Sequence, residues 1–205
     1  MSGKAHWERV YSASPADSLG WYQAHLRTSL AWIKALDLAP DARIIDIGGG
    51  ASTLVDDLLD AGHRSITVLD LSGHALSSAQ ARLGNKARLV TWLEGDVTSI
   101  DLRTHYYDLW HDRAVFHFLT TVDQQRKYQD VLLRGLKPGG HLIIATFAPE
   151  APPTCSGLSV QRYAPEELQA VLGGEFELKL DQKEMHVTPG GVEQMYLYCH
   201  FRRAN

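Results

Sequence analysis

The stretch Asp46-Ile47-Gly48-Gly49-Gly50-Ala51-Ser52 stands between a short apolar run, Arg43 to Ile47, and a segment with apolar residues at helical spacing, Leu54 to Leu59. This order predicts a strand, a glycine loop and a helix. A ligand that approaches the backbone at the carboxyl end of a strand needs residues without side chains, and the start of the helix offers free N–H groups. Taken alone, the loop also suits an ordinary tight turn or a dinucleotide-binding loop.

The alternation of strand and helix continues along the chain. Further strand candidates end at Asp70, at the segment Glu94 to Val97 and near Trp110, and a fifth is the run His141 to Phe147. The segments between them carry apolar residues at helical spacing, and Thr121 to Gln124 has the pattern of a capping box. We therefore expect an α/β protein with a mostly parallel sheet and helices on both faces, the three-layer arrangement of a Rossmann-like fold.

The two ends of the chain carry different patterns. Between Ser18 and about Leu36, apolar residues recur at roughly helical spacing and predict an N-terminal helix that includes Trp21 and Tyr22. Near the other end, two strand candidates flank the turn residues Thr188 to Gly191 and predict a terminal hairpin. Alternating residues give its second strand two unlike faces: Met195, Leu197, Cys199 and Phe201 against Tyr196, Tyr198 and His200. The nearby Glu184 and His186 are interpreted as part of a solvated hairpin edge.

The composition restricts the class of protein. The chain has 205 residues, a net charge of −4 and 44% hydrophobic residues, which predicts one domain over residues 1–205 that folds without a metal or disulfide. Lys and Arg are scattered and the pI is near 6.2, so nucleic acid is not expected as a partner. There is no apolar run of the roughly 18 residues that span a membrane and no signal-peptide core. These absences, with only Cys155 and Cys199 as cysteines, predict a cytoplasmic protein without membrane association or a metal site.

Three carboxylates at strand ends distinguish among the ligands that the glycine loop could bind. Asp46, two residues before Gly48, would repel a pyrophosphate but suits a cationic ligand, which disfavours NAD. Asp70 follows Gly50 by 20 residues, a placement that suits hydrogen bonds from ribose hydroxyls. Asp96 can accept a hydrogen bond from the exocyclic amino group of adenine. Together they describe an adenosine site without a phosphate pocket and with a negative group near its far end, which S-adenosylmethionine fits.

The sequence resembles the class I S-adenosylmethionine-dependent methyltransferases from about Ala42 to Arg203. The resemblance depends on the segments Asp46 to Gly50, Tyr107 to Ala114 and Leu136 to Leu142, and on the acidic strand ends Asp70 and Asp96. Ser52 departs from the family pattern, which often has a third glycine there, and a small residue should be tolerated. The resemblance implies a seven-stranded sheet whose last strand runs antiparallel.

The resemblance also implies roles for individual residues. The glycines would pass under the methionine and ribose of the cofactor, the end of the second strand would hold the ribose, and the end of the third would bracket the adenine. His111 would sit beside the methionine part. The residues expected to bind the cofactor are Trp21, Tyr22, Asp46, Gly48, Gly49, Gly50, Asp70, Leu71, Asp96, Val97 and His111.

The N-terminal segment resembles one subgroup of the family. His6-Trp7, Tyr11 and Trp21-Tyr22 are similar to residues of small bacterial methyltransferases of unassigned substrate and, more distantly, of eukaryotic lysine methyltransferases of elongation factors. In that subgroup the segment covers the cofactor, so we expect a helical lid over residues 1–38. Core packing is the plain alternative for Trp21 and Tyr22.

Methyl transfer places modest demands on the protein. A methyl group on a sulfonium is already activated, so the protein need mainly align donor and acceptor and exclude water. For an amine or hydroxyl acceptor the candidate bases are His111, Asp112 and His117, whereas a thiol can react as its thiolate. The alternative is that Asp112 pairs with Arg113 and that His117 is a satisfied buried histidine. We expect Asp70→Ala to abolish cofactor binding, and His117→Ala to leave binding intact but reduce turnover.

The acceptor is most simply a small molecule, because the chain is compact and has a possible lid. The subgroup resemblance favours a protein lysine instead: an acidic groove would support lysine, and a closed apolar pocket would support a small acceptor. A nicotinamide-dependent reductase is a rival that leaves Asp46 and the segment Glu94 to Asp96 unexplained. A cofactor-binding protein without catalysis is another. Cys155, in the loop Pro149 to Gly157 after the fifth strand, could contact the acceptor.

Overall fold

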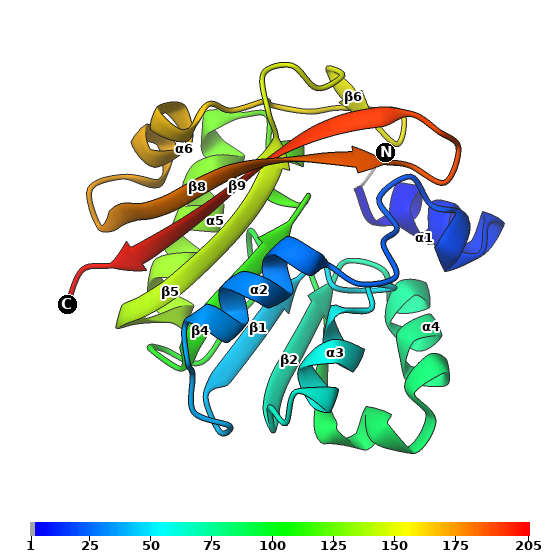
Figure 1. The fold of residues 1–205 in the computed structure, drawn as a ribbon, viewed down its shortest axis with the longest axis horizontal. Helices are drawn as coiled ribbons and strands as arrows, with labels where there is room; N and C mark the ends of the chain where they lie inside the picture. Colours follow the sequence, from blue (N-terminus) through cyan, green and yellow to red (C-terminus); the bar gives the residue numbers. More distant parts are fainter. Residues whose placement is uncertain (1–2) are drawn as a thin grey trace.

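A seven-stranded sheet in the order β3-β2-β1-β4-β5-β9-β8 forms the centre of the computed structural model, which describes residues 3–205 (Figure 1). Its strands are β1 Arg43–Ile47, β2 Ser65–Asp70, β3 Val90–Glu94, β4 Tyr107–Arg113, β5 Leu136–Phe147, β8 Phe176–Val187 and β9 Glu193–Arg203. The neighbours among β1 to β5 pair in parallel, whereas β9 is antiparallel to both β5 and β8. The expected seven-stranded sheet with an antiparallel last strand is therefore confirmed.

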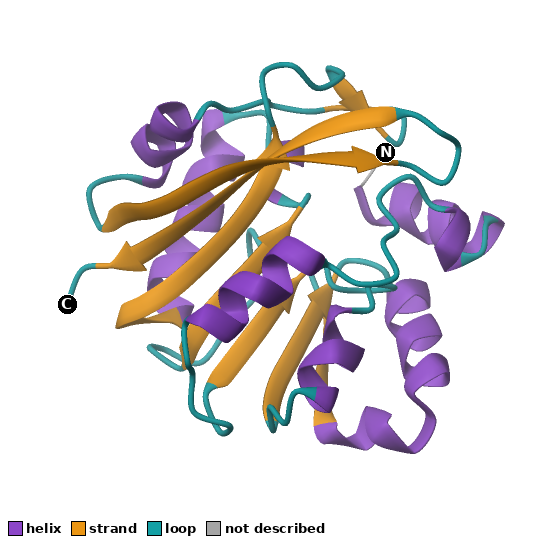
Figure 2. Cartoon of the chain, viewed as in Figure 1, coloured by secondary structure: helices purple, strands orange, loops and turns teal. Residues whose placement is uncertain are grey.

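Helices cover both faces of the sheet (Figure 2). Packing against one face are α2 Arg27–Ala35, α3 Leu54–Asp60 and α4 Gly73–Leu83, and against the other α5 Val122–Gly135 and α6 Pro165–Leu172. The two faces follow from the alternation along each strand, because Ile44 joins the first of these cores and Ile45 the second. The three-layer arrangement of a Rossmann-like fold is thus observed.

Shorter elements complete the chain. Helix α1, Gly3–Ala13, lies beside α4 near the ends of the strands (Figure 1). A small hairpin is made by β6 Thr154–Cys155 and β7 Leu158–Ser159, and single 3-10 turns cover Ala16–Ser18, Gly84–Leu89 and Phe116–Phe118. Residues 1 and 2 of the expected lid segment lie outside the described residues.

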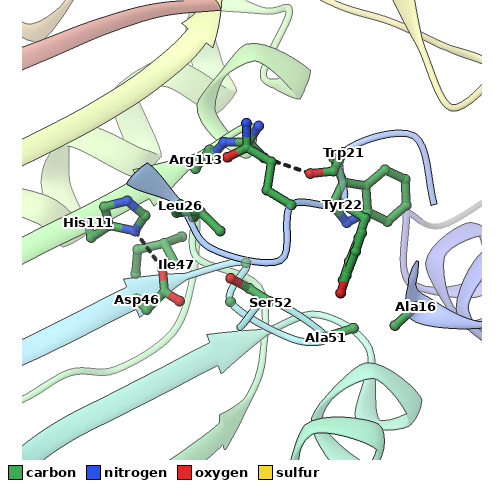
Figure 3. Close-up of a pocket in the computed structure, with 13 residues that line it drawn as sticks. Ala16, Trp21, Tyr22, Leu26, Asp46, Ile47, Ala51, Ser52, His111 and Arg113 are labelled. Carbon is green, nitrogen blue, oxygen red and sulfur yellow. Dashed lines mark hydrogen bonds and ion pairs between the residues drawn. The ribbon is translucent and has the colours of Figure 1, made fainter. Parts of the chain in front are cut away.

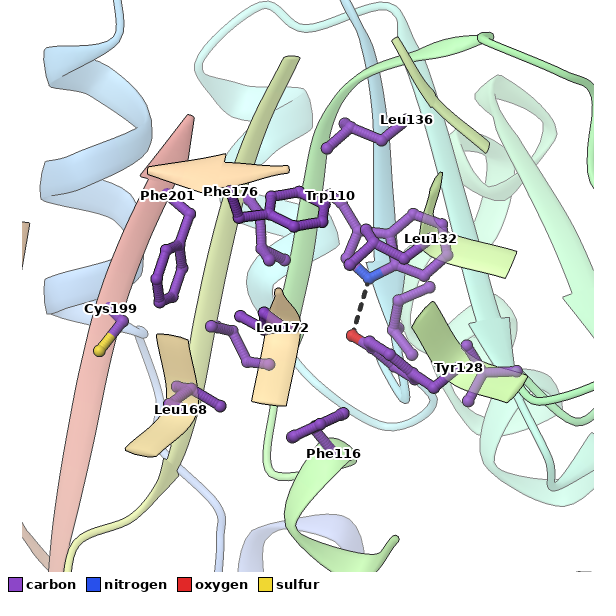
Figure 4. Close-up of a cluster of buried hydrophobic side chains, with 14 of the residues drawn as sticks. Trp110, Phe116, Tyr128, Leu132, Leu136, Leu168, Leu172, Phe176, Cys199 and Phe201 are labelled. Atoms are coloured by element: carbon purple, nitrogen blue, oxygen red, sulfur yellow. Dashed lines mark hydrogen bonds between the residues drawn. The ribbon is translucent and has the colours of Figure 1, made fainter. Parts of the chain in front are cut away.

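The core between the sheet and α5 contains polar atoms that satisfy one another (Figure 4). The indole Nε1 of Trp110 donates to the hydroxyl of Tyr128 at 3.0 Å, and that hydroxyl donates to Oδ2 of Asp112 at 2.7 Å. All three residues are buried. Since a buried polar group without a partner is destabilising, this chain of hydrogen bonds is part of what holds α5 against β4.

The expected helix from Ser18 to Leu36 is wrong in its first half. Helix α2 begins only at Arg27, and the segment from Gly20 to Leu26 is not helical. Its polar groups bind β8 instead: the carbonyl of Gly20 accepts from Nε2 of His186 at 2.7 Å, and Nε2 of Gln23 donates to Glu184 at 2.9 Å. Tertiary hydrogen bonds have therefore replaced the local ones that the spacing of apolar residues suggested.

The interpretation of Glu184 and His186 as a solvated hairpin edge is also wrong. His186 is buried, and Glu184 additionally accepts a hydrogen bond from the hydroxyl of Thr28 at the start of α2. The two side chains attach the segment Gly20 to Thr28 to the C-terminal hairpin. Because this segment carries Trp21, the hairpin helps to place an aromatic wall of the candidate site.

Candidate active site

The glycine loop leaves β1 with a backbone that side chains would obstruct. Gly48 has φ of +66°, and a Cβ atom there would lie 2.1 Å from Cγ2 of Val115. A Cβ on Gly50 would lie 2.4 Å from Oδ2 of Asp70. Both positions therefore require glycine, the first for its left-handed conformation and close approach and the second for the contact with a carboxylate.

Asp70 closes β2 beside this loop. Its carboxylate is buried and accepts a hydrogen bond from the backbone N–H of Ser72 at 2.8 Å. Burial raises the pKa of Asp70 to about 7, which the nearby charge of Asp46 reinforces and the backbone N–H groups of Ser72 and Gly50 oppose. Further hydrogen-bond donors from a ligand in the cavity would stabilise this buried carboxylate.

Asp46 and His111 meet at the ends of β1 and β4 (Figure 3). Nδ1 of His111 lies 2.7 Å from Oδ1 of Asp46, and Nε2 of His111 lies 2.9 Å from the hydroxyl of Ser29 on α2. An imidazole protonated at Nδ1 donates to the carboxylate and accepts from the hydroxyl. Oδ2 of Asp46 is buried and has no hydrogen-bond partner within residues 3–205. This oxygen is free to accept a hydrogen bond from a cationic group.

A small cavity of about 30 Å³ adjoins this pair. The glycine loop forms one wall and the segment from Trp21 to Leu26 forms another (Figure 3). Ile47, Gly48, Trp21 and Arg113 also line a second, larger cavity. Because these four residues line both cavities, the two cavities adjoin each other.

The larger cavity has a volume of about 350 Å³ and lies over the carboxyl ends of the strands. One end is bounded by Asp70, Leu71, Asp96 and Val97. The remaining wall is largely apolar and aromatic, with contributions from Trp7, Tyr11, Trp21, Phe118, Cys155 and Leu158. The larger cavity thus has an acidic end, which can accept hydrogen bonds, and an apolar end, which can pack against an apolar group.

Four aromatic rings pack against one another in this wall. The ring of Trp7 lies edge-on at 5.7 Å from Trp21 and at 5.1 Å from Phe118, and Tyr11 lies 5.7 Å from Trp21. These centroid distances are those of favourable aromatic pairs. The packing joins α1, the segment after it and the 3-10 turn after β4 into one surface.

Helix α1 is attached to the body of the protein by polar contacts as well. The carboxylate of Glu8 accepts from the backbone N–H of Gly73 at 2.8 Å, at the start of α4. Lys4 forms an ion pair with Glu94 at the end of β3. Since Lys4, Trp7 and Tyr11 line the larger cavity, α1 covers it.

Arg113 ends β4 on the same face as His111. Its Nε donates to the hydroxyl of Tyr198 at 3.0 Å and its Nη1 to the carbonyl of Trp21 at 3.0 Å, and its Cζ lies 4.4 Å from the centroid of the Tyr196 ring. Its Nη2 is buried without a hydrogen-bond partner among the described residues. The expected alternative of an ion pair between Asp112 and Arg113 is not seen in residues 3–205.

The structure brings most of the residues expected to bind the cofactor to one of the two cavities. These are Trp21, Tyr22, Asp46, Gly48, Gly49, Asp70, Leu71, Asp96, Val97 and His111. Gly50 does not line either cavity, and its backbone N–H is directed at Asp70 instead. Trp21 and Tyr22 reach the cavities from a turn and not from the expected helix.

Asp112 and His117, two of the three candidate bases, line neither cavity. Asp112 points to the opposite face of the sheet, where Tyr128 and the backbone N–H groups of Val115 and Phe116 bind it. Burial raises the pKa of Asp112 to about 6. His117 accepts a hydrogen bond at Nδ1 from the backbone of Phe147, and burial, helped by the charge of Arg113, lowers the pKa of His117 to about 3.

Some lining residues escaped the sequence analysis. Phe118 and Leu158 carry no local signal, because each belongs to an apolar run or a loop whose partners are distant in sequence. From the sequence, Arg113 was expected near the arriving acceptor and as the possible partner of Asp112. In the described part of the chain, no group of three or more His, Cys, Asp or Glu side chains could hold a metal ion. Across residues 3–205 we also find no helix with the length and apolar character needed to cross a bilayer.

Comparison with known proteins places this site in a family. Residues 45–144, from the first strand to the fifth, match the model of a methyltransferase domain. Residues 45–144 thus form a methyltransferase domain, of the class I S-adenosylmethionine-dependent kind. The strand order and the carboxylates at the ends of β1, β2 and β3 agree with that membership.

Individual relatives are distant. The chain is 20% identical over 149 residues to the eEF1A lysine and N-terminal methyltransferase of Bos taurus, covering 70% of this chain and 21% of the relative. It is 26% identical over 200 residues to the ubiquinone/menaquinone biosynthesis C-methyltransferase UbiE of Syntrophotalea carbinolica, covering 84% and 83% of the two chains. The present chain thus spans about a fifth of the length of the eEF1A methyltransferase.

A solved structure shows the same fold over the whole chain. It is the 1,6-didemethyltoxoflavin-N1-methyltransferase of Burkholderia thailandensis, crystallised with 1,6-didemethyltoxoflavin and S-adenosylhomocysteine. The TM-score is 0.68 at 18% identity, covering 100% of this chain and 85% of the other. At this identity the similarity concerns the fold.

Proposed function

We propose that this protein transfers a methyl group from S-adenosylmethionine to a small-molecule acceptor. The observation that carries the proposal is the pair of adjoining cavities. One end presents the carboxylates of Asp46 and Asp70, the other is apolar, and α1 covers the larger cavity. A charged, adenosine-bearing donor and an apolar acceptor can therefore occupy neighbouring spaces.

The donor-side residues fit the cofactor by their own chemistry. The unpartnered Oδ2 of Asp46 suits the ammonium group of the methionine part, and Asp70 suits the two ribose hydroxyls. Asp96 and Val97 would bracket the adenine. S-adenosylmethionine supplies a methyl group on a positively charged sulfur, which is already activated for transfer.

The protein's own contribution is positioning and the exclusion of water. The acceptor's lone pair would form the new bond to the methyl carbon while the carbon–sulfur bond breaks. The electron pair of the broken bond would stay on the sulfur of the departing S-adenosylhomocysteine. A proton lost from an acceptor N, O or S atom passes to solvent. The cover provided by Trp7 and Tyr11 and the walls provided by Trp21 and Phe118 hold the two reactants in line.

A strong base is not required for this reaction. His111 lines the small cavity, but both of its ring nitrogens are engaged by Asp46 and Ser29, so we propose that it positions Asp46. Asp112 and His117 are turned away from the cavities, and we propose that they hold β4 and the turn after it in shape.

The walls of the larger cavity favour a small acceptor over a protein lysine. Its charged lining residues are Lys4, Asp70, Asp96 and Arg113. Lys4 is paired with Glu94, and the acids lie at the adenosine end. The apolar end therefore faces a guanidinium and aromatic rings, whereas an acceptor lysine would be better served by carboxylates. UbiE and the toxoflavin enzyme are relatives whose names denote small-molecule methylation.

Isothermal titration with S-adenosylmethionine, S-adenosylhomocysteine and NADH tests the donor. We expect micromolar binding of the first two and none of NADH. Transfer of a labelled methyl group to a panel of small thiols, phenols and amines, set against lysine-bearing proteins, then tests the acceptor. Binding of NADH alone would support the reductase instead, and cofactor binding without transfer to any acceptor would support a non-catalytic binding protein.

A further inference from the structure

No carboxylate of residues 3–205 contacts the guanidinium of Arg113, although the charge of Glu184 acts on it from a distance. Its hydrogen bonds go to a hydroxyl, Tyr198, and to a carbonyl, Trp21, and its Nη2 has no partner. Within residues 3–205 no carboxylate forms an ion pair with it. Arginine keeps its charge at all ordinary pH values. A bound anion would therefore stabilise this partly buried cation.

The position of Arg113 is fixed by its neighbours. Two hydrogen bonds and the face of the Tyr196 ring hold the guanidinium between β4 and β9. The side chain cannot swing out to solvent without losing these contacts. A charge that is held in place before a ligand arrives costs little to organise when the ligand binds.

The surroundings of Arg113 place it toward the acceptor end of the larger cavity. Its charge acts on the thiol of Cys155 and on His117, both beyond the ends of β4 and β5, and Leu158 and Phe118 line the same space. The donor's own charged end faces Asp46 and the glycine loop. Arg113 also lines the small cavity, but the effect of its charge on Cys155 and His117 favours the apolar end as the source of its anion.

Resting on the proposed function, we propose that the acceptor is a small apolar or aromatic molecule that carries a carboxylate, and that Arg113 binds this carboxylate. The rings of Trp7, Trp21 and Phe118 would contact the apolar body of the acceptor. The guanidinium would orient the molecule so that its nucleophilic atom faces the methyl group. Arg113 is then the residue that selects acids over neutral analogues.

Matched pairs of probes separate the charge from the apolar body. They are 4-hydroxyphenylacetate and 4-hydroxyphenylacetamide, 2-mercaptobenzoate and 2-mercaptobenzamide, and anthranilate and anthranilamide. Each is titrated into the protein with S-adenosylhomocysteine bound, followed by tryptophan fluorescence, and offered as an acceptor with labelled S-adenosylmethionine. We expect at least one acid to bind or react about tenfold or more better than its amide.

The variants then assign that preference to Arg113. In Arg113→Met the acid and the amide should bind within about twofold of each other, and Arg113→Lys should keep part of the preference because it retains the charge. Tyr198→Phe removes one hydrogen bond from the guanidinium but keeps the ring, and should weaken the preference severalfold. Thermal unfolding of each variant shows whether it is folded.

Several results would overturn the inference. The wild-type protein could bind no acid better than its amide, or Arg113→Met could keep the preference. The anion could instead be the cofactor's own carboxylate. In that case the Arg113→Met protein would bind S-adenosylhomocysteine more than about tenfold more weakly than the wild type, and would bind the decarboxylated cofactor as well as the wild type does. If the wild-type protein does not bind S-adenosylhomocysteine at all, the proposed donor fails, and acid-over-amide binding to the protein alone still tests Arg113.

Discussion

Nδ1 of His111 lies 2.7 Å from Oδ1 of Asp46, and this buried contact leaves the other carboxylate oxygen without a partner. The histidine thereby fixes the orientation of the carboxylate, and Ser29 in turn holds the histidine. Asp46 lines the cavity that adjoins the glycine loop. A cation bound there would complete the hydrogen bonding of the group.

Asp46→Asn should weaken binding of the amino acid part of the cofactor but not of its adenosine part. We expect affinity for S-adenosylhomocysteine to fall by about 10- to 100-fold, because a charged hydrogen bond to the ammonium group is lost. Affinity for 5′-methylthioadenosine, which lacks the amino acid part, should change little. Isothermal titration measures both, with Asp60→Asn on the exposed side of α3 as a control. An equal loss for both ligands would place Asp46 away from the methionine part.

Asp70→Ala should abolish measurable cofactor binding, because the ribose hydroxyls lose the acceptor that orients them. For the wild-type protein, affinity should rise as the pH increases from 6 to 8. The pKa of Asp70 is raised to about 7 by burial, and the ionised form accepts both hydroxyls. Titrations at pH 6.5 in two buffers of different ionisation enthalpy should show proton release on binding. A pH-independent affinity would contradict this role.

The same carboxyl affects the stability of the free protein in the opposite direction. Because its folded pKa, about 7, lies above the ordinary value of 3.8, the folded state holds a proton that the unfolded state has lost, and the free energy of unfolding falls as the pH rises between these values. The cost at pH 8 is of the order of 4 kcal/mol. Asp70→Asn should therefore raise the melting temperature at pH 8 and have less effect near pH 4. A lower melting temperature at pH 8 would show that the carboxylate is stabilised by contacts that an amide cannot make.

Trp7→Ala should loosen the cover of the larger cavity. The ring packs against Trp21 and Phe118, and its loss removes two aromatic contacts. We expect faster dissociation of S-adenosylhomocysteine, by about tenfold or more, in stopped-flow fluorescence. Glu8→Gln keeps the shape but weakens the bond to the backbone of Gly73, and should give a smaller effect in the same direction. Unchanged dissociation in both variants would mean that α1 does not limit exchange.

The C-terminal hairpin should affect the site through the segment that it holds. His186→Ala removes the hydrogen bond to the carbonyl of Gly20 and the contact with Gln23. We expect faster amide hydrogen exchange over Gly20 to Leu26 and weaker cofactor binding, severalfold in size. A matched control is Val187→Ala, the exposed neighbour on β8. Equal exchange in the two variants would separate the hairpin from the site.

Much of the fold could be read from local patterns. The glycine loop, the acidic strand ends and the alternation of strands with helices each depend on residues close in sequence, and the structure reproduces their order. The two faces of β9 also follow from simple alternation, because Leu197 and Cys199 join one core and Tyr196 and Tyr198 another.

The orientation of the residues after Trp110 could not be read in this way. The sequence predicts a fourth strand that ends near Trp110, which leaves His111 to Arg113 beyond the strand and able to face an acceptor. The strand instead continues to Arg113, so successive side chains alternate and Asp112 points away from His111 and Arg113. Pairing with Ile144 and Ala145 on β5 sets this extension, and β5 is distant in sequence. The segment Gly20 to Leu26 differs from its expected helix for the same reason, since its partners are on β8.

The attachment of α1 also has a consequence for the timing of each reaction cycle. The helix is seated by Glu8 on the first turn of α4 and by Lys4 on the end of β3, directly over the space for adenosine. If the adenosine of the donor binds there as proposed, we expect the helix to lift each time the nucleoside enters or leaves. We then expect an ordered reaction in which the donor binds first and the spent donor leaves last.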